Sequence, residues 1–280
     1  MLIATDLDGT LLTPEGTISP RTRDAIRAAE RVGVPVVPVT ARQIYGIEKW
    51  RDDLGRWALC SNGAICWDLQ AHTVLFRQLM SAAVANEFAH RLLAAAPGIR
   101  FLTIKDDGLT FASQRGYAGL TTFADHSRDP SDMPALDLDE ARDGDCLKTA
   151  ARHPSLPIEE LAARAAGVGM TDEVHVTTSG KPMLEISAKG VTKDSGLAML
   201  CDHLGIDQRD TVAFGDGAND VEMLEWAGDS YAMANAVPLA VEAARHRAPS
   251  NAEDGVAKVV EELLAVSEQG DERFAAHNGG

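Results

Sequence analysis

The stretch Ile3-Ala4-Thr5-Asp6-Leu7-Asp8-Gly9-Thr10-Leu11-Leu12 is the strongest structural signal in the chain. Apolar residues lead into two aspartates one residue apart, and this predicts a short buried strand over residues 1–5. Asp6 then follows the carboxyl end of a strand, where open α/β sheets place their ligand sites. On a strand that continued, Asp6 and Asp8 would point to the same side, and Gly9 would let the backbone turn away behind them.

Two neighbouring carboxylates indicate a particular chemistry. They repel each other, so one tends to take up a proton unless a cation lies nearby. Mg²⁺ removes this penalty and prefers oxygen ligands. One aspartate could then attack phosphorus to form an aspartyl-phosphate while the other moves protons. A solvated loop that happens to hold two acids is the alternative, because so short a motif is not specific by itself.

The bulk composition is that of a globular chain with ample length for a core. Its 280 residues are 45% hydrophobic, and the formal net charge of −16 argues against non-specific binding to nucleic acid or an anionic membrane. A metal and a few cations can still bind a phosphorylated small molecule locally. We expect either a monomer or a weak dimer.

Two further features favour a cytoplasmic location. The sequence shows neither an apolar run long enough to span a membrane nor a signal-peptide pattern at its beginning. The four cysteines show no zinc-like pairing, so we expect free thiols in a reducing compartment, with a Cys60–Cys66 disulfide as the disfavoured alternative.

Strand and helix patterns alternate in the first and last parts of the chain, which predicts an α/β fold with a Rossmann-like parallel-sheet core. Predicted strands cover residues 1–5, 34–39, 57–60, 211–214 and 231–233, the last being the final core strand. Ser19-Pro20 predicts the start of the first helix, and further helices are predicted over 44–53, 193–204 and from about 220.

The middle of the chain has its own set of elements. Strands are predicted over 101–104, 109–112, 146–151, 174–178 and 183–187, and the Asp- and Pro-rich stretch 125–142 is predicted to be a loop. About 100 residues suffice for a separate domain. We therefore expect a core over 1–80 and 188–268, an inserted α/β domain over 81–187, which the resemblance given below implies to be a cap, and a flexible tail over 269–280.

Four loops at the carboxyl ends of predicted strands gather the polar residues. They carry Asp6 with Asp8, Thr40 with Arg42, Ser61-Asn62-Gly63, and Asp216 with Asn219 and Asp220; Lys193 stands at a helix start. Phosphoryl transfer needs such a set, in which a nucleophile, a metal, cations and a hydroxyl donor surround a charged phosphorus centre.

In order and spacing, these motifs resemble the haloacid dehalogenase superfamily. The first motif is matched by Asp6-Leu7-Asp8-Gly9-Thr10, the second by Thr40, the third by Lys193 and the fourth by Gly215-Asp216-Gly217-Ala218-Asn219-Asp220. The insert between Thr40 and Lys193 is similar to the subgroup with an α/β cap after the second motif, the Cof-type and sugar-phosphate phosphatases. Met233-Ala234-Asn235-Ala236 and residues 251–256 also look like this subgroup. Ala41 and Ala234 depart from it, because members often carry glycine there.

The resemblance implies catalytic and metal-binding roles. Asp6 would be the nucleophile and a metal ligand, and Asp8 the acid for the leaving group and then the base for water. The backbone carbonyl of Asp8 would also touch the metal. Asp216 would be a direct Mg²⁺ ligand, whereas Asp220 would support the ligands from behind.

The resemblance also implies substrate-binding roles. Thr40 and Lys193 would bind phosphoryl oxygens, and Asn219 would donate to the phosphate or orient Asp8. Arg42 and Asn62 are further candidates, although Arg42 could equally face solvent and Asn62 could be only a turn residue. His175 and Lys181, on the predicted cap, could also face the substrate, but an exposed strand residue is the more ordinary interpretation of both.

The sequence thus predicts a Mg²⁺-dependent phosphatase, a phosphoric monoester hydrolase for a small phosphorylated metabolite such as a sugar phosphate. A phosphomutase on hexose phosphates is the enzymatic alternative, and a non-catalytic phosphate-binding regulator is the alternative from another class. A second domain of a size to close over the site favours an enzyme, because closure excludes water during turnover.

Overall fold

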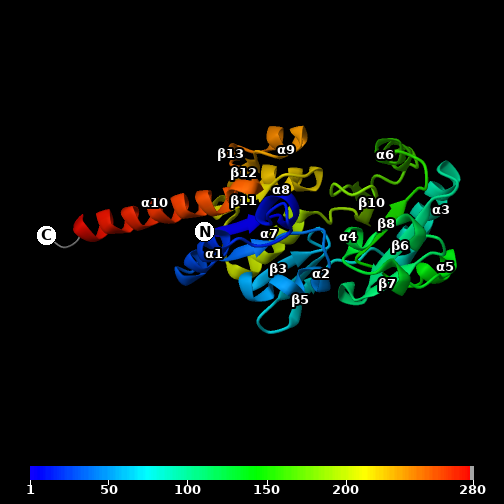
Figure 1. The fold of residues 1–280 in the computed structure, drawn as a ribbon, viewed down its shortest axis with the longest axis horizontal. Coiled ribbons are helices and arrows are strands. Elements are labelled where there is room, and N and C mark those ends of the chain that lie inside the picture. The colour runs from blue at the N-terminus through cyan, green and yellow to red at the C-terminus, as the bar shows by residue number, and fades with distance from the viewer. Residues whose placement is uncertain (278–280) are drawn as a thin grey trace.

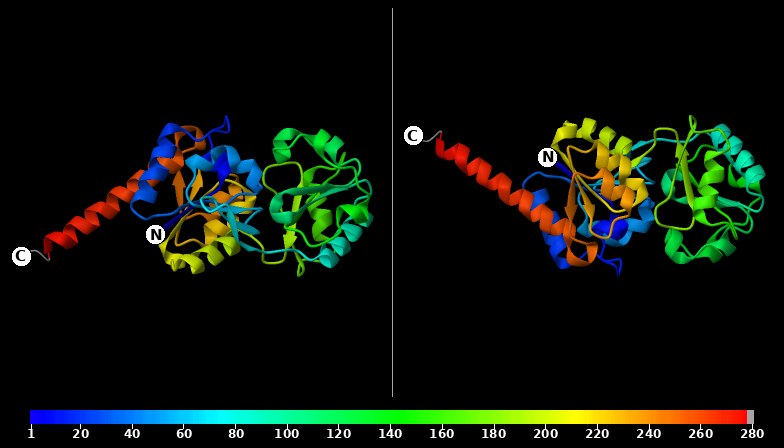
Figure 2. Two further views of the ribbon diagram at one scale, coloured as in Figure 1. Left: turned by 90° about the horizontal axis from the view of Figure 1, so that it is seen from below. Right: turned by 90° about the horizontal axis from the view of Figure 1, so that it is seen from above.

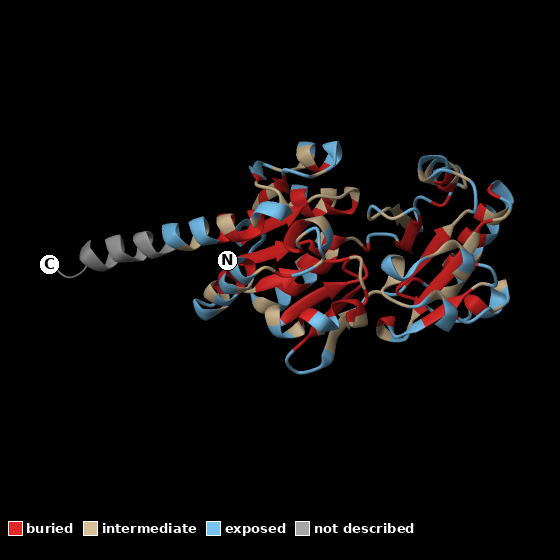
Figure 3. Ribbon diagram, viewed as in Figure 1, coloured by how far each residue is buried: buried red, intermediate tan, exposed pale blue. Residues whose placement is uncertain are grey.

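The protein consists of two α/β units joined side by side, as the computed structural model shows (Figure 1). The structure describes residues 1–277, and the side chains as far as residue 266. Buried residues follow the strands of both units, so each has its own core (Figure 3).

The first unit, the core, is built on a parallel five-stranded sheet of order β13-β12-β11-β1-β2. Its strands are β1 (Leu2–Thr5), β2 (Val36–Pro38), β11 (Thr211–Gly215), β12 (Asp229–Met233) and β13 (His246–Ala248). The prediction that residues 231–233 form the last core strand was wrong, because β13 adds an edge strand that is short and half polar. The carboxyl ends of all these strands meet at one edge of the sheet.

A three-stranded antiparallel sheet extends the core beyond β2. It consists of β3 (Trp57–Cys60), β4 (Ile65–Asp68) and β5 (Thr73–Arg77). β3 lies beside the end of β2 through a parallel pairing of Val39 with Leu59. The turn after β3 therefore lies at the same edge as the loops that follow β1, β2 and β11.

Helices cover both faces of the parallel sheet (Figure 2). On β1, Ile3 packs in the cluster that includes α1 and α10, whereas Leu2 and Ala4 pack in the cluster of α7 and α8. This alternation follows from the two-residue period of a strand. The helices are α1 (Pro20–Arg31), α2 (Ile44–Ile47), α7 (Lys193–Leu204), α8 (Val221–Trp226), α9 (Pro238–Ala243) and α10 (Gly255–His277). Ser19 caps α1 as predicted, accepting the backbone N–H of Thr22.

The second unit, which we call the cap, runs from α3 to β10. Its antiparallel sheet has the order β7-β6-β8-β10-β9. The elements are α3 (Ala82–Ala95), β6 (Arg100–Lys105), β7 (Thr110–Ser113), α4 (Phe123–His126), α5 (Leu138–Ala141), β8 (Lys148–Arg152), α6 (Ile158–Ala166), β9 (Val174–Thr177) and β10 (Leu184–Ala188).

One face of the cap sheet packs on α3 and α6, and the other faces the core. Phe88, Phe101 and Leu161 belong to the cluster on the helical side. On the core side, Tyr45 meets Phe111 of the cap with ring centroids 5.4 Å apart. The cap therefore closes over the edge of the core sheet where the strands end.

The segment 125–142, predicted to be a loop, contains short helices instead. Capping boxes begin α4 and α5, with Thr122 and Asp125 at the first and Asp137 and Glu140 at the second. These local hydrogen bonds stabilise single helical turns, which the sequence did not predict because they show no apolar periodicity.

The remaining predictions concern the end of the chain and the cysteines. α10 is helical as far as His277, where the sequence indicates a tail from residue 269, and residues 278–280 lie outside the described part. None of the helices described is long and apolar enough to cross a lipid bilayer. All four cysteines are free and buried.

Two glycines bring α7 close to the turn that follows β3. A Cβ atom added at Gly196 would lie 2.6 Å from the Cα atom of Gly63, and one at Gly63 would lie 2.3 Å from the carbonyl oxygen of Thr192. Gly63 also has a φ of +86°. Only glycine permits this approach, which sets the first turn of α7, and with it Lys193, against the sheet edge.

We predict that Gly196→Ala lowers the free energy of unfolding by about 1–3 kcal/mol, because the added methyl must displace backbone, although alanine is the better helix former. Urea unfolding followed by circular dichroism measures the change. Gly119→Ala is the matched control, since a Cβ there meets no atom within 4 Å. Equal stability of the Gly196 variant and wild type would contradict the tight fit.

Candidate functional site

The loop after β1 places Asp6 and Asp8. The backbone leaves the strand after Thr5, and Leu7–Leu11 form a π-helical turn. The strand therefore ends before Asp6, as predicted, and the turn sets the positions of Asp6 and Asp8 in place of the alternation of a continuing strand. Gly9 has a φ of +89°, and a Cβ atom there would lie 2.3 Å from Asp216 Oδ2. The turn thus brings the first acidic loop directly against the loop after β11.

Three aspartates meet at this edge of the sheet. Oxygen atoms of Asp6, Asp216 and Asp220 all lie within 4.8 Å of one another. The buried ammonium of Lys193 donates to Asp6 Oδ1 at 2.5 Å and to Asp220 Oδ1 at 2.6 Å. The predicted convergence of the first, third and fourth motifs is therefore present in the fold.

The aspartates carry more negative charge than one lysine offsets. Burial raises the pKa of Asp6 well above its usual range, against the opposing charge of Lys193, and the charges of Asp220 and Asp216 raise it further. Burial likewise raises the pKa of Asp216 to about 6, although the hydroxyl of Thr10 donates to it at 2.7 Å. A further cation is needed to keep these carboxylates ionised at neutral pH.

The donor set fits a magnesium ion. Asp220 Oδ2 accepts the backbone N–H groups of Asp216 and Gly217 at 2.9 and 2.8 Å, so Asp220 fixes this loop. The Oδ2 atoms of Asp6 and Asp216 accept no hydrogen bond from any residue that the structure describes. Free carboxylate oxygens from two strand ends are the hard ligands that Mg²⁺ prefers.

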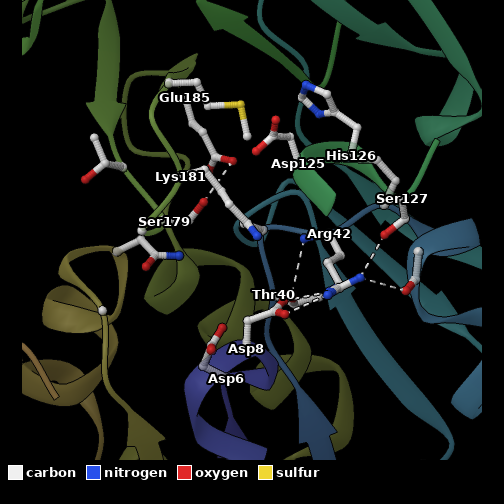
Figure 4. A pocket seen from close by; sticks show the side chains of 18 of the residues that line it. Asp6, Asp8, Thr40, Arg42, Asp125, His126, Ser127, Ser179, Lys181 and Glu185 are labelled. Atoms are coloured by element: carbon white, nitrogen blue, oxygen red, sulfur yellow. Dashed lines mark hydrogen bonds and ion pairs between the residues drawn. The ribbon is translucent and has the colours of Figure 1, made fainter. Parts of the chain in front are cut away.

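Arg42 holds the second aspartate of the first motif. Its Nε and Nη2 atoms each donate to a different oxygen of Asp8 at 2.6 Å, and Nη1 donates to Ser127 Oγ of the cap at 2.8 Å (Figure 4). Burial alone would raise the pKa of Asp8, but the hydrogen bonds and charge of Arg42 hold it below its usual range. Asp8 is therefore ionised in this arrangement.

Thr40 lies between these groups and is buried. Its Oγ1 atom accepts the backbone N–H of Arg42 at 3.1 Å. No described residue accepts the hydroxyl hydrogen, and Thr40 lines the cavity, so this hydrogen is available to an anion there.

A buried chain of polar side chains links core and cap behind the aspartates. Asn219 donates to Asn62 at 3.0 Å, and Asn62 donates to Glu185 of the cap at 2.6 Å. Lys148, also of the cap, donates to Glu185 at 3.0 Å and to the carbonyl oxygen of Ala41 at 2.8 Å. Burial would raise the pKa of Glu185, but the charge of Lys148 together with the hydrogen bonds lowers it.

A cavity of about 380 Å³ lies between core and cap. From the cap, its roof includes Asp125, His126, Ser179 and Lys181, which Figure 4 shows above the aspartates. Burial lowers the pKa of His126 to about 4, so this imidazole is neutral, and its Nε2 atom lies 2.9 Å from the hydroxyl of Tyr117. The roof thus offers both polar and aromatic groups to a bound molecule.

Most of the residues predicted from the motifs line this cavity, namely Asp6, Asp8, Thr40, Arg42, Asp216, Asn219 and Asp220. Lys193 lies beneath them and Asn62 lies behind Asn219. Of the two cap candidates, Lys181 lines the cavity. His175 does not, and lies 3.9 Å from Glu222 of the core instead.

Apart from Lys181, sequence reasoning missed the polar residues that the cap contributes to the site. Glu185 stands between Leu184 and Ile186 on β10, and this alternation indicates that it faces away from the helical side of the cap. The pattern does not show that another domain covers that face. No sequence pattern indicated a role in the site for Asp125, His126 or Ser127, because they lie in the stretch predicted to be a loop.

Residues 3–260 match the model of haloacid dehalogenase-like hydrolases.

The chain belongs to the haloacid dehalogenase-like hydrolases.

Relatives and solved structures agree with this membership. The chain is 29% identical over 283 residues to the 5-amino-6-(5-phospho-D-ribitylamino)uracil phosphatase YwtE of Bacillus subtilis, covering 94% of this chain and 98% of the relative. It is 29% identical over 243 residues to the pyridoxal phosphate phosphatase YbhA of Escherichia coli, covering 84% and 88%. The fold matches that of the HAD subclass IIB sugar phosphatase BT4131 with a TM-score of 0.79 at 22% identity, covering 94% and 98%.

These findings confirm several predictions from the sequence. They confirm the family and the subgroup with an α/β cap after the second motif. They also confirm the fold class and the assignment as a phosphatase. Ala41, a departure from the subgroup's usual glycine, contacts Lys148 through its backbone oxygen, so this contact does not depend on the side chain.

We predict that Glu185→Gln lowers the free energy of unfolding by about 3 kcal/mol at pH 7, because it leaves the buried ammonium of Lys148 without its counter-charge. The matched control is Glu160→Gln, from an exposed pair with Arg164, for which a change below about 0.5 kcal/mol is expected.

The difference between wild type and the Glu185 variant should depend on pH. A carboxyl with a lowered folded-state pKa stabilises the protein above its ordinary value of 4.5 and loses this contribution as the pH falls through the lowered value. Urea unfolding at pH 7 and below pH 4.5 should therefore show a difference that shrinks in acid. A difference that is constant with pH would contradict the role of the charge.

Proposed function

We propose that this protein is a Mg²⁺-dependent phosphatase that hydrolyses a small phosphorylated metabolite, similar to a sugar phosphate, through an aspartyl-phosphate on Asp6. The observation that carries the proposal is the position of Asp6. Its carboxylate lies at a strand end, hydrogen-bonded to Lys193 and beside Asp216, and it opens into a cavity that the cap covers.

Asp6 and Asp216 would hold the metal ion through their free oxygens, together with the backbone carbonyl of Asp8. Asp220 would keep the Asp216 loop in place through the two backbone N–H groups that it accepts. When bound, Mg²⁺ would offset the negative charge of the transferring phosphoryl group.

The first step is an in-line attack. An oxygen of Asp6 forms a bond to phosphorus as the bond from phosphorus to the ester oxygen breaks, and Asp8 gives a proton to the departing oxygen. Thr40 donates its hydroxyl hydrogen to a phosphoryl oxygen, and Lys193 keeps Asp6 oriented and also faces the phosphoryl group.

The second step hydrolyses the aspartyl-phosphate. Asp8 takes a proton from water as the water oxygen bonds to phosphorus, the bond to Asp6 breaks, and inorganic phosphate leaves. The ionised Asp8, held by two hydrogen bonds from Arg42, has the protonation state that this base requires. For the first step, Arg42 must let Asp8 carry a proton.

The size and lining of the cavity support a small substrate. A volume of about 380 Å³ suits a metabolite, and the roof combines polar groups with Phe111 and Met183. Similar proteins act on pyridoxal phosphate and on a ribitylaminouracil phosphate, and the structural neighbour is a sugar phosphatase. We also propose a cytoplasmic location, which the buried free thiols support.

We predict that Asp6→Asn lowers the hydrolysis of p-nitrophenyl phosphate at least 1,000-fold, on the order expected when a nucleophile is removed. Asp24→Asn, an exposed substitution on α1, is the matched control and should keep wild-type activity. Residual activity of the Asp6 variant within tenfold of wild type would rule out Asp6 as the nucleophile.

Removal of divalent cations should abolish turnover. We expect EDTA to stop the release of inorganic phosphate from p-nitrophenyl phosphate and from hexose phosphates, and added Mg²⁺ to restore it, because the buried aspartates need a cation to stay ionised. Full activity in EDTA would contradict the metal site. Conversion of a hexose 1-phosphate to the 6-phosphate without release of phosphate would identify a mutase.

A further inference from the structure

Three cations among the described residues line the cavity, and two of them already have hydrogen-bond partners. Arg42 is bound to Asp8, Ser127 and a backbone carbonyl, and Lys148 is bound to Glu185 and the carbonyl of Ala41. Lys181 is different, because its ammonium neither donates a hydrogen bond to a described residue nor forms an ion pair with one.

Lys181 reaches the cavity from the cap. It lies in the loop between β9 and β10, and its side chain points from the cap into the cavity, towards the side of Arg42 and Asp8 (Figure 4). Its positive charge is among the causes that lower the pKa of Asp8, which agrees with this position. The ammonium therefore lies on the cap side of the cavity, within range of the charge of Asp8.

The charges of the site leave a place for this cation. On the floor, the cations that the structure shows paired with Asp6, Asp8, Asp216 and Asp220 are Arg42 and Lys193, and one divalent ion would balance the remaining charge. A phosphate monoester then adds up to two negative charges, while both floor cations are held by carboxylates.

The other charges of the roof cancel in pairs. Glu185 is paired with Lys148, and Asp125 is paired with Arg152 at 2.6 Å. Burial keeps the imidazole of His126 neutral. Lys181 is thus the cation of the cavity wall that has free donors for an incoming anion.

We propose that Lys181 binds a non-bridging oxygen of the substrate's phosphoryl group, so that the cap completes the phosphate site. The proposal rests on the phosphatase function proposed above and deepens it. Lys181 acts on the group that every phosphate ester shares, and not on a feature of the leaving group. Binding of the phosphoryl group and closure of the cap are then one event.

The experiment compares Lys181→Met with Lys181→Arg and with Lys189→Met as the matched control, because Lys189 is an exposed lysine directly after β10 and lies outside the cavity. Each is assayed with p-nitrophenyl phosphate, glycerol 3-phosphate and 3-phosphoglycerate, of which only the last carries a carboxylate. Inhibition by inorganic phosphate is measured in parallel, and urea unfolding verifies that each variant is folded.

For Lys181→Met we expect kcat/KM to fall about 10- to 100-fold with all three esters, as for the loss of a charge-assisted hydrogen bond. The inhibition constant of inorganic phosphate should rise by a similar factor. Lys181→Arg should recover most of the loss, and Lys189→Met should match wild type.

Two results would overturn the proposal. A loss confined to 3-phosphoglycerate would show that Lys181 serves an anionic leaving group, and unchanged kinetics with unchanged phosphate inhibition would show a solvated lysine. If wild type hydrolyses none of the esters, the proposed function fails, but the affinity for inorganic phosphate, measured by calorimetry on wild type and Lys181→Met, still decides the role of Lys181.

Discussion

The repulsion between buried carboxylates at one edge of the sheet is the constraint on which this structure depends. Asp6, Asp216 and Asp220 share a space less than 5 Å across, and a single buried lysine touches two of them. The neighbouring elements hold this cluster together. The glycine turn after β1 admits Asp216, the backbone of the β11 loop satisfies Asp220, and the glycine contact under α7 sets Lys193 in place. The repulsion among these carboxylates lowers the stability of the folded protein, and the apolar clusters elsewhere offset this loss.

The floor of the site could be predicted from the sequence because its geometry follows from the topology of the core. Parallel strands end at the same edge, so Asp6 after β1, Thr40 after β2 and Asp216 after β11 had to converge. The details were less predictable. A tight turn, and not a continuing strand, orients Asp8, and β13 is too short and polar to give a strand pattern.

The roof was largely hidden from sequence reasoning, for a physical reason. An antiparallel sheet normally has one polar face in contact with water, so the alternation of apolar and polar residues on β10 predicts that Glu185 is exposed. Burial of that face depends on how the cap sits on the core, which no local pattern encodes. From the sequence, Lys181 could be named only as a cap residue that could face the substrate. The case for its role in phosphate binding comes from the charges around it.

The Lys148–Glu185 pair has a consequence for the motion of the cap. Both members belong to the cap, so when the cap lifts away from the core the ion pair travels with it intact. Separation gives up the contacts of the pair to Asn62 and Ala41, each worth about 1.5–3 kcal/mol at most, and water can replace both. Neither Lys148 nor Glu185 is left without its counter-charge when the two units separate. This buried polar contact between core and cap can therefore separate at modest energetic cost, because the ion pair itself is never broken.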